Sequence, residues 1–262
     1  MPISLALVVG VLGAALGPTL ARAASVLHRH WPSVGDLTRG LRVRTPSPSG
    51  EPALAPPGTS SRSGRLGDLR HHGDRRRERR RTVACTVACA CLFTLAAQHW
   101  GGTVRLAPYL LLFAVLVVVA LIDLEHYLIP DRVVFPALGL SVLATAAASF
   151  VDGTPGALVW ATLGALAFCA GLLAVHLLTP AGMGFGDVKV ALLLGWFLGW
   201  SAANVGDALG KVLLAMLAAS AAGSLVGLVL LARRGRGAHY PFGPWLALGV
   251  VAVLLLTPAV PG

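Results

Sequence analysis

The acidic residues that could do chemistry in this sequence are few. From Thr82 to the C-terminus, the only acidic residues are Asp123, Glu125, Asp131, Asp152, Asp187 and Asp207. Asp123 directly follows an apolar run at 106–122, and Asp187 lies in the glycine-rich segment GMGFGDVK, 182–189, between two apolar runs. Because a carboxylate at membrane depth is costly unless it faces water or a polar partner, Asp123 and Asp187 are the candidate functional residues. Asp152 and Asp207 are interpreted as ordinary solvated loop residues.

Two carboxylates that meet in a partly dry site can catalyse hydrolysis. The two carboxyl groups cannot both be ionised at the same time, so the pair shares one proton. One carboxylate can then activate water as a base while the other acts as an acid. The glycines at 182, 184 and 186 would let the backbone approach an extended substrate closely. Phosphate binding at this turn is disfavoured, since the segment lacks the Lys–Ser/Thr pair of a phosphate-binding loop and Asp187 would repel an anion.

The rest of the sequence indicates a membrane protein. Of its 262 residues, 56% are hydrophobic and 12% are charged, against roughly a quarter charged in a soluble domain. Eight apolar runs can be marked, at 1–21, 82–98, 106–122, 133–151, 156–178, 190–205, 212–232 and 245–260. Because the bilayer core lacks water, these runs must form helices or closed barrels, and their length favours helices. We therefore predict an all-α polytopic membrane protein with about eight transmembrane helices.

The distribution of basic residues predicts the orientation in the membrane. If the N-terminus is outside, the inside loops hold 19 basic residues and the outside loops hold only Arg105 and Lys211. This asymmetry satisfies the positive-inside rule. It predicts that the inside loops 22–81, 123–132, 179–189 and 233–240 face the cytoplasm. Asp123 and Asp187 then belong to the same, cytoplasmic face.

The first inside loop, 22–81, carries 14 of the 21 basic residues. Its middle, 45–64, is rich in Pro, Ser and Gly, which predicts disorder. The segment HHGDRRRERRR, 71–81, is interpreted as a clamp against anionic lipid, with nucleic-acid binding as the minor alternative. His71 and His72 lack a partner at metal-ligand spacing and are interpreted as loop residues.

The four cysteines give no indication of a metal site or a disulfide framework. Cys85, Cys89, Cys91 and Cys169 all lie in apolar runs, and none forms a C-x-x-C pair. We interpret them as small buried apolar side chains.

Three segments carry a family resemblance. IDLEHYLIPD, 122–131, resembles the first signature of the prepilin peptidases, the type IV leader peptidases. The segment 182–199 is similar to their second signature, whose G-x-G-D motif falls on Gly184, Phe185, Gly186 and Asp187. PFGPWLALG, 241–249, resembles their C-terminal signature. The resemblance runs from Leu106 to the C-terminus, and the first 80 residues match only loosely.

This resemblance implies an aspartic endopeptidase in the inner (cytoplasmic) membrane, with Asp123 and Asp187 as the catalytic pair. It implies removal of the basic leader peptide from type IV pilin-like precursors at the cytoplasmic face, for pilus or secretion-system assembly. Prepilin-like proteins and the lipid bilayer would be its partners, and proteolysis would need no cofactor. The expected organisation is a first transmembrane helix at 1–21, the basic loop at 22–81 and a membrane peptidase domain at 82–262.

Other motif residues have expected supporting roles. Asp131 follows Pro130 and precedes an apolar run, so we expect it to be an N-cap. Glu125 and His126 are interpreted as interfacial residues, with a supporting polar role as the alternative. Lys189 fits the family motif, and it could balance local charge, contact an acidic group of the substrate, or extend from a helix end toward water.

One departure from the family pattern concerns a second activity. Many bacterial members have two C-x-x-C pairs in the first cytoplasmic loop and methylate the new N-terminus with S-adenosylmethionine. The loop 22–81 contains no cysteine. Zinc is therefore not expected, and S-adenosylmethionine would be needed only if methylation is retained.

Two other functions are considered. Intramembrane carboxylates also mark ion paths, so an ion- or proton-coupled transporter is the main alternative. The position of both acids at one face, rather than at the midplane, weighs against transport. An inactive assembly factor that binds pilins without cutting them is the third hypothesis.

Overall fold

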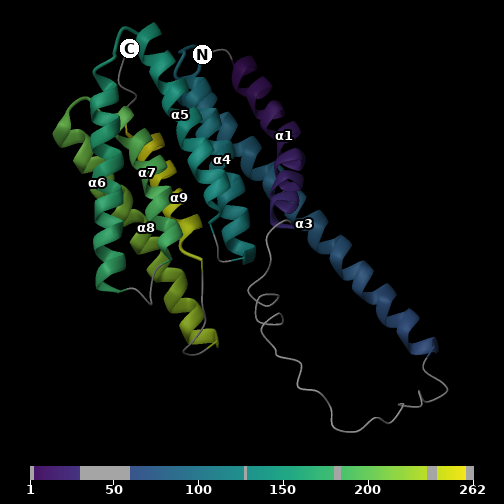
Figure 1. The fold of residues 1–262 in the computed structure, drawn as a ribbon. Coiled ribbons are helices and arrows are strands. Elements are labelled where there is room, and N and C mark those ends of the chain that lie inside the picture. Colours follow the sequence, from purple (N-terminus) through teal and green to yellow (C-terminus); the bar gives the residue numbers. More distant parts are fainter. Residues whose placement is uncertain (1–2, 30–59, 127–128, 180–183, 235–240, 258–262) are drawn as a thin grey trace, which may run out of the picture.

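The computed structural model describes residues 3–29, 60–126, 129–179, 184–234 and 241–257. These residues form eight helices that run side by side, with no strand among them (Figure 1). The helices are α1 (Ile3–Arg29), α3 (Ser60–Trp100), α4 (Leu106–His126), α5 (Asp131–Val151), α6 (Ala157–Leu178), α7 (Phe185–Trp200), α8 (Val205–Arg234) and α9 (Gly243–Leu256). The prediction of an all-α polytopic architecture is confirmed.

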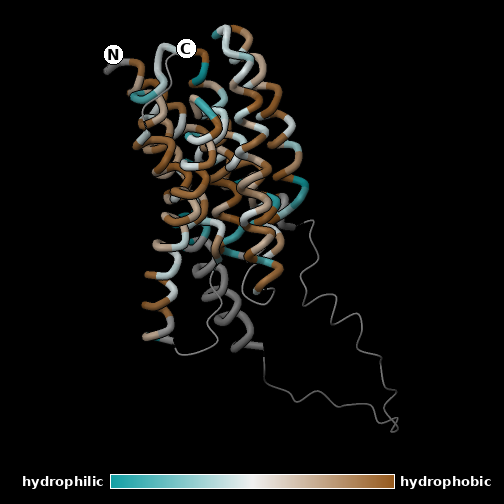
Figure 2. The backbone as a smooth tube through the Cα atoms, turned by 90° about the vertical axis from the view of Figure 1, so that its left-hand side faces the viewer, coloured by the Kyte–Doolittle hydropathy of each residue, from teal (hydrophilic) through white to brown (hydrophobic). Residues whose placement is uncertain are grey.

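Six of these helices, α1, α3, α4, α5, α6 and α8, contain segments long and apolar enough to cross a membrane. Hydrophobic residues make up most of the bundle part of these helices (Figure 2). The other two are shorter, with 16 residues in α7 and 14 in α9. At 1.5 Å per residue they span about 24 and 21 Å, less than the roughly 30 Å of a bilayer core. Most of α7 is buried among its neighbours.

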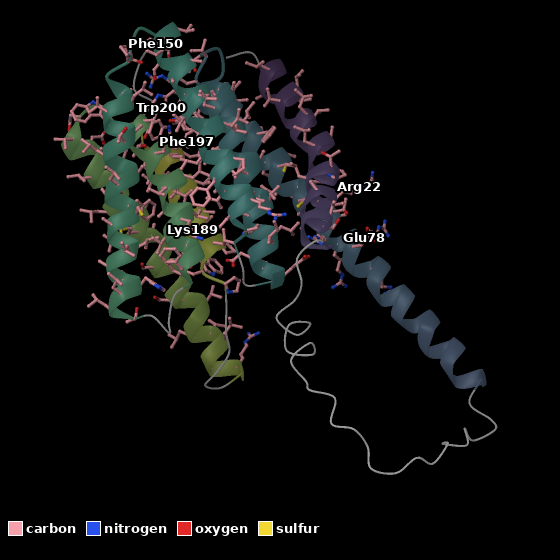
Figure 3. The ribbon with its side chains drawn as sticks, viewed as in Figure 1. Arg22, Glu78, Phe150, Lys189, Phe197 and Trp200 are labelled. Carbon is pink, nitrogen blue, oxygen red and sulfur yellow. The ribbon has the colours of Figure 1, made fainter. Side chains whose placement is uncertain are left out.

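The helices join alternately at the two ends of the bundle (Figure 1). The last turns of α4, α6 and α8 and the first turns of α5, α7 and α9 lie at one end, which we call the site end. The connections at 101–105, 152–156 and 201–204 lie at the opposite end, the far end. Figure 3 shows Lys189 toward the site end and Phe150 and Trp200 toward the far end.

The basic segment before the second apolar run is helical. α3 begins at Ser60 and continues without interruption to Trp100, and its first half projects beyond the bundle (Figure 1). The interpretation of His71 and His72 as loop residues is therefore wrong, because arginine-rich sequence without proline is compatible with a helix. Of the segment 45–64 predicted to be disordered, 60–64 is helical and 45–59 lies outside the described residues.

Two helix pairs pack closely through glycine. At the α6–α7 interface, a Cβ on Gly195 would collide with the backbone of Gly164, and one on Gly199 would collide with the backbone of Trp160. A Cβ on Gly13 of α1 would likewise collide with the backbone carbonyl of Cys89 on α3. Small residues allow this backbone approach, which is the usual basis of helix association in membranes.

Buried side-chain hydrogen bonds join α5 to α7. The indole N–H of Trp196 donates to Thr145 Oγ1 at 2.9 Å, and that of Trp200 donates to Ser149 Oγ at 2.8 Å. Buried polar groups of this kind are stable only when paired. These contacts therefore fix the rotation of α7, which carries Asp187.

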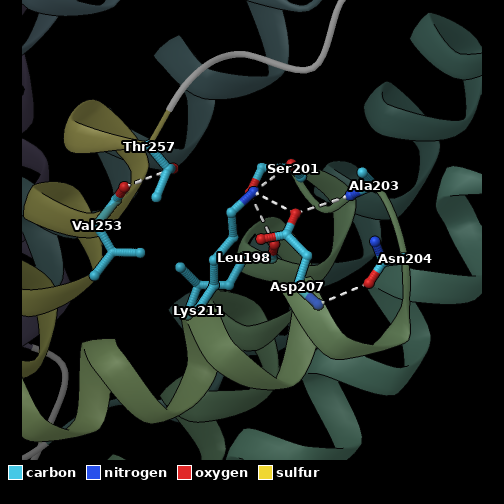
Figure 4. A network of polar contacts seen from close by, with 8 residues as sticks. All are labelled: Leu198, Ser201, Ala203, Asn204, Asp207, Lys211, Val253 and Thr257. Carbon is cyan, nitrogen blue, oxygen red and sulfur yellow. Dashed lines mark hydrogen bonds and ion pairs between the residues drawn. The ribbon is translucent and has the colours of Figure 1, made fainter.

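The far end holds two buried basic side chains. Arg105 lies 2.8 Å from Asp152, and Lys211 donates to the carbonyl of Ser201 at 2.6 Å and lies 3.0 Å from Asp207 (Figure 4). The interpretation of Asp152 and Asp207 as ordinary solvated residues is therefore wrong. Each neutralises a buried cation, which would otherwise be costly to bury.

Candidate active site

Asp123 lies in the last turn of α4 and is 5% exposed. The backbone N–H of Gly243, the first residue of α9, donates to Asp123 Oδ2 at 3.0 Å. A Cβ on Gly243 would lie 2.6 Å from the same oxygen. The third sequence signature therefore supplies a backbone donor that orients Asp123, and only glycine fits at this position.

Asp187 lies in the first turn of α7 and is 6% exposed. α7 begins at Phe185, directly after Gly184 in an extended conformation, and the N–H of Asp187 donates to the Gly184 carbonyl at 3.2 Å. The apolar run predicted to start at 190 thus belongs to a helix that starts five residues earlier. Asp187 is held on a helix rather than in a loop.

The structure brings the two aspartates together from separate helices. The last turn of α4 carries Asp123 and the first turn of α7 carries Asp187, and both turns lie at the same end of the bundle. Both side chains are buried at the site end, where α4, α7 and α9 converge. Such a pair can share a proton and offer one base and one acid to a water molecule.

A second charged pair connects the segments that carry the aspartates. Lys189 Nζ lies 2.6 Å from Oδ1 and 2.7 Å from Oδ2 of Asp131. The N-cap prediction for Asp131 is wrong, because α5 begins at Asp131 itself and Pro130 occupies the cap position. Among the roles considered for Lys189, local charge balance is the one that this contact supports.

Two glycine-motif residues lie beside this ion pair. Lys189 Nζ lies 5.3 Å from the centre of the Phe185 ring, which is a cation–π distance. A Cβ on Gly186 would lie 2.9 Å from Ile129 Cβ. Gly186 therefore lets α7 approach the turn between α4 and α5.

Glu125 lies at the end of α4, and its carboxylate is 2.9 Å from an Arg81 nitrogen on α3. This places Glu125 in an ion pair between α3 and α4. The side chain of His126 is outside the described part of the structure.

The described residues offer no metal site. No three His, Cys, Asp or Glu side chains among them lie close enough together to hold an ion. Cys85 and Cys89 are buried on α3, whereas Cys91 is exposed and Cys169 lies on α6.

Sequence reasoning missed two contacts of the site, the Gly243–Asp123 hydrogen bond and the Lys189–Asp131 pair. A signal existed for the first, since 241–249 carries a family signature. It did not specify a hydrogen bond to an aspartate 120 residues away.

Fold and site together define a helical membrane protein with a buried aspartate pair at one end of its bundle. Residues 110–230 match the model of the type IV leader peptidase family. Over these residues the chain is similar to this family.

Curated relatives agree with this assignment. The chain is 35% identical over 172 residues to the prepilin leader peptidase/N-methyltransferase of Pseudomonas putida, covering 64% of this chain and 56% of the relative. It is 37% identical over 174 residues to the protein of the same name from Aeromonas hydrophila (66% and 56%), and 27% identical over 175 residues to that of Bacillus subtilis (66% and 64%). The chain thus spans less than two thirds of the length of these relatives. No solved structure matches.

Proposed function

We propose that this protein is a membrane aspartic endopeptidase that removes the basic leader peptide from type IV pilin-like precursors. The observation that carries the proposal is that Asp123 and Asp187, on separate helices, are both buried at the same end of the bundle. The printed names of the relatives support the choice of prepilins as substrates. The products would serve assembly of a pilus or a secretion system.

The proposed reaction is hydrolysis by a carboxylate pair. The ionised carboxylate takes a proton from water as the water oxygen attacks the scissile carbonyl carbon, and the protonated carboxylate donates its proton to the carbonyl oxygen. When the tetrahedral gem-diol collapses, the C–N bond breaks and the carboxyl group that took the water proton donates it to the leaving nitrogen. The other carboxylate takes a hydroxyl proton from the gem-diol, which regenerates the starting protonation state. The Gly243 N–H orients Asp123 during this sequence. No step requires a metal or S-adenosylmethionine.

The position of the pair favours hydrolysis over transport. An ion path across the bundle needs polar groups near the membrane midplane. Both carboxylates instead lie in terminal turns at the site end, where a leader peptide could arrive from the aqueous phase. The middle of α7 instead buries the apolar side chains of Leu193, Leu194 and Phe197, which do not provide the polar groups of an ion path.

The test is cleavage of a prepilin-like precursor co-expressed with each variant, followed by mass spectrometry of the precursor N-terminus. We expect Asp123→Asn and Asp187→Asn each to abolish cleavage. Each variant keeps only one carboxyl group, which cannot act as base and acid at the same time. Glu78→Gln, an exposed acidic position on α3, is the matched control and should cleave normally. Normal cleavage by both aspartate variants would refute the proposal, and so would an inactive wild-type chain that carries protons in a vesicle flux assay.

The proposed orientation puts the site end in the cytoplasm and the N-terminus outside. In a cysteine-free background, Pro155→Cys at the far end should react with a membrane-impermeant maleimide added to intact spheroplasts. Thr179→Cys at the site end should react only after permeabilisation. Both positions are exposed in the structure. The reverse labelling pattern would contradict the orientation.

A further inference from the structure

An apolar groove lies beside the candidate active site, between α3, α4 and α9. Its walls come from 84–92 of α3, 116–124 of α4 and 244–251 of α9, and its volume is about 260 Å³. Leu124 adjoins Asp123 in sequence, and Pro244 adjoins Gly243. The groove walls therefore include the residues next in sequence to the Asp123–Gly243 contact.

The shape of the groove matches a short stretch of helix. Each wall stretch has eight or nine residues, and at 1.5 Å per residue this is about 12 Å, or two helical turns. Ala84, Ala88, Ala120 and Ala247 all lie on its walls. Small side chains of this kind allow the close approach of another helix in a membrane.

A charged pair marks the polar end of the groove. Arg81 and Glu125 lie 2.9 Å apart, one turn before Cys85 on α3 and directly after Leu124 on α4. Beyond this pair the groove walls are apolar. A bound chain would therefore change from polar to apolar at the level of Asp123.

We propose that this groove binds the first turns of the apolar helix that follows the cleaved bond in the precursor, so that the bond is placed at Asp123 and Asp187. The inference rests on the proposed function, which requires a polar leader joined to an apolar helix. The Arg81–Glu125 pair selects this occupant, because it gives the groove a polar end two residues after Asp123 on α4 and leaves the rest of its walls apolar. An amphipathic or apolar helix in a groove is a common mode of recognition, with anchor side chains one and two turns apart.

Photo-crosslinking tests the location directly. The probe is a synthetic peptide with a Lys/Arg leader, a glycine and a Leu/Ala helix that carries photo-leucine one and two turns after the glycine. It is added to the full-length Asp187→Asn protein in phosphatidylethanolamine/phosphatidylglycerol vesicles. We expect crosslinks on 116–124 and 244–251. Crosslinks confined to α5 or α6 would overturn the proposal. So would labelling of the groove by a photoreactive phosphatidylglycerol that the peptide does not displace.

Filling the groove tests its role in substrate binding. Ala120→Phe should raise KM for the helix-bearing peptide by about tenfold, and Ala247→Leu is a milder second variant. The reason is that the larger side chain displaces about one apolar side chain of the substrate from the groove. Ala147→Phe, at an exposed position on α5, is the control. Cleavage of a short soluble peptide across the same junction should fall less than cleavage of the helix-bearing peptide in the two filled variants, and Ala147→Phe should leave both unchanged.

The outcomes separate the two proposals. Unchanged KM for the helix-bearing peptide in both filled variants would overturn the groove assignment. Equal loss of cleavage for the long and short peptides, in variants that melt like the wild type, would also overturn it. If the wild type cleaves neither peptide, the proposed function fails, while the crosslinking pattern still reports what occupies the groove.

Discussion

Lys189 binds Asp131 through both carboxylate oxygens, at 2.6 and 2.7 Å, and thereby ties the first turn of α7 to the first turn of α5. Asp187 is two residues before Lys189, and Asp123 is eight residues before Asp131. The ion pair therefore connects the two segments that present the candidate catalytic carboxylates. Its side chains are 24% and 50% exposed, so it is accessible to water at the site end.

We expect Lys189→Ala to lower kcat by at least about tenfold while KM changes little, because small displacements of catalytic groups have large effects on rate. Stability should change by less than about 1 kcal/mol, since exposed ion pairs contribute little. The measurement is steady-state cleavage of a prepilin-like peptide together with thermal melting in detergent.

The swapped variant Asp131→Lys/Lys189→Asp provides the control for this pair. If the contact positions the site, the swap should recover part of the kcat that each single variant loses. A swap that is no better than the single variants would show that the two residues act separately.

Gly243→Ala should abolish most cleavage, because a Cβ there would meet Asp123 Oδ2 at 2.6 Å and displace the carboxylate. The helix itself tolerates alanine, so the protein should still fold. Gly139→Ala on α5, where a Cβ meets nothing within 4 Å, is the matched control. Full activity in Gly243→Ala would contradict the proposed role of this contact.

Gly199→Ala should destabilise the fold, since a Cβ at Gly199 would collide with the Trp160 backbone on α6. Overpacking of this kind costs about 1–3 kcal/mol. Gly210→Ala on α8 meets nothing within 4 Å and should stabilise by up to about 1 kcal/mol through helix propensity. Thermal melting in detergent distinguishes the two, and equal melting temperatures would refute this account of the α6–α7 packing.

Ser149→Ala should cost about 1–3 kcal/mol of stability, because it leaves the buried Trp200 N–H without its acceptor. Ser141 is two turns earlier on the same helix, and its buried hydroxyl oxygen has no hydrogen-bond partner. Ser141→Ala should therefore be neutral or stabilising. The measurement is the unfolding temperature of the wild type and of both variants in detergent, and Ser149→Ala should have the lowest of the three.

The helices were predictable from apolar run length, but several of their ends were not. α1 continues beyond position 21 to Arg29, and α8 begins at Val205 rather than at 212. Hydropathy marks where a helix is apolar, whereas the hydrogen-bonded backbone continues through polar residues until a breaker or a turn ends it. The same reason explains why α3 includes the basic segment 71–81.

The candidate site was predictable as a list of residues and less so as a set of contacts. Asp123 and Asp187 stood out because charged residues in apolar surroundings are rare. The partners of Asp131 and Asp123 lie 58 and 120 residues away, and local patterns do not specify such pairs. The N-cap prediction for Asp131 failed by one position, because Pro130 has the extended conformation of a cap residue and α5 begins at Asp131.

The glycine contacts between α6 and α7 constrain the helix that carries Asp187 more tightly than the helix that carries Asp123. Where backbones touch, at Gly195 on Gly164 and at Gly199 on Trp160, no side chain is present to change rotamer and absorb a shift. These contacts oppose sliding and rotation of α7 along α6 and so hold the backbone that carries Asp187. We therefore expect any adjustment of the helices around the site to occur on the α4 side, which carries Asp123 and borders the groove.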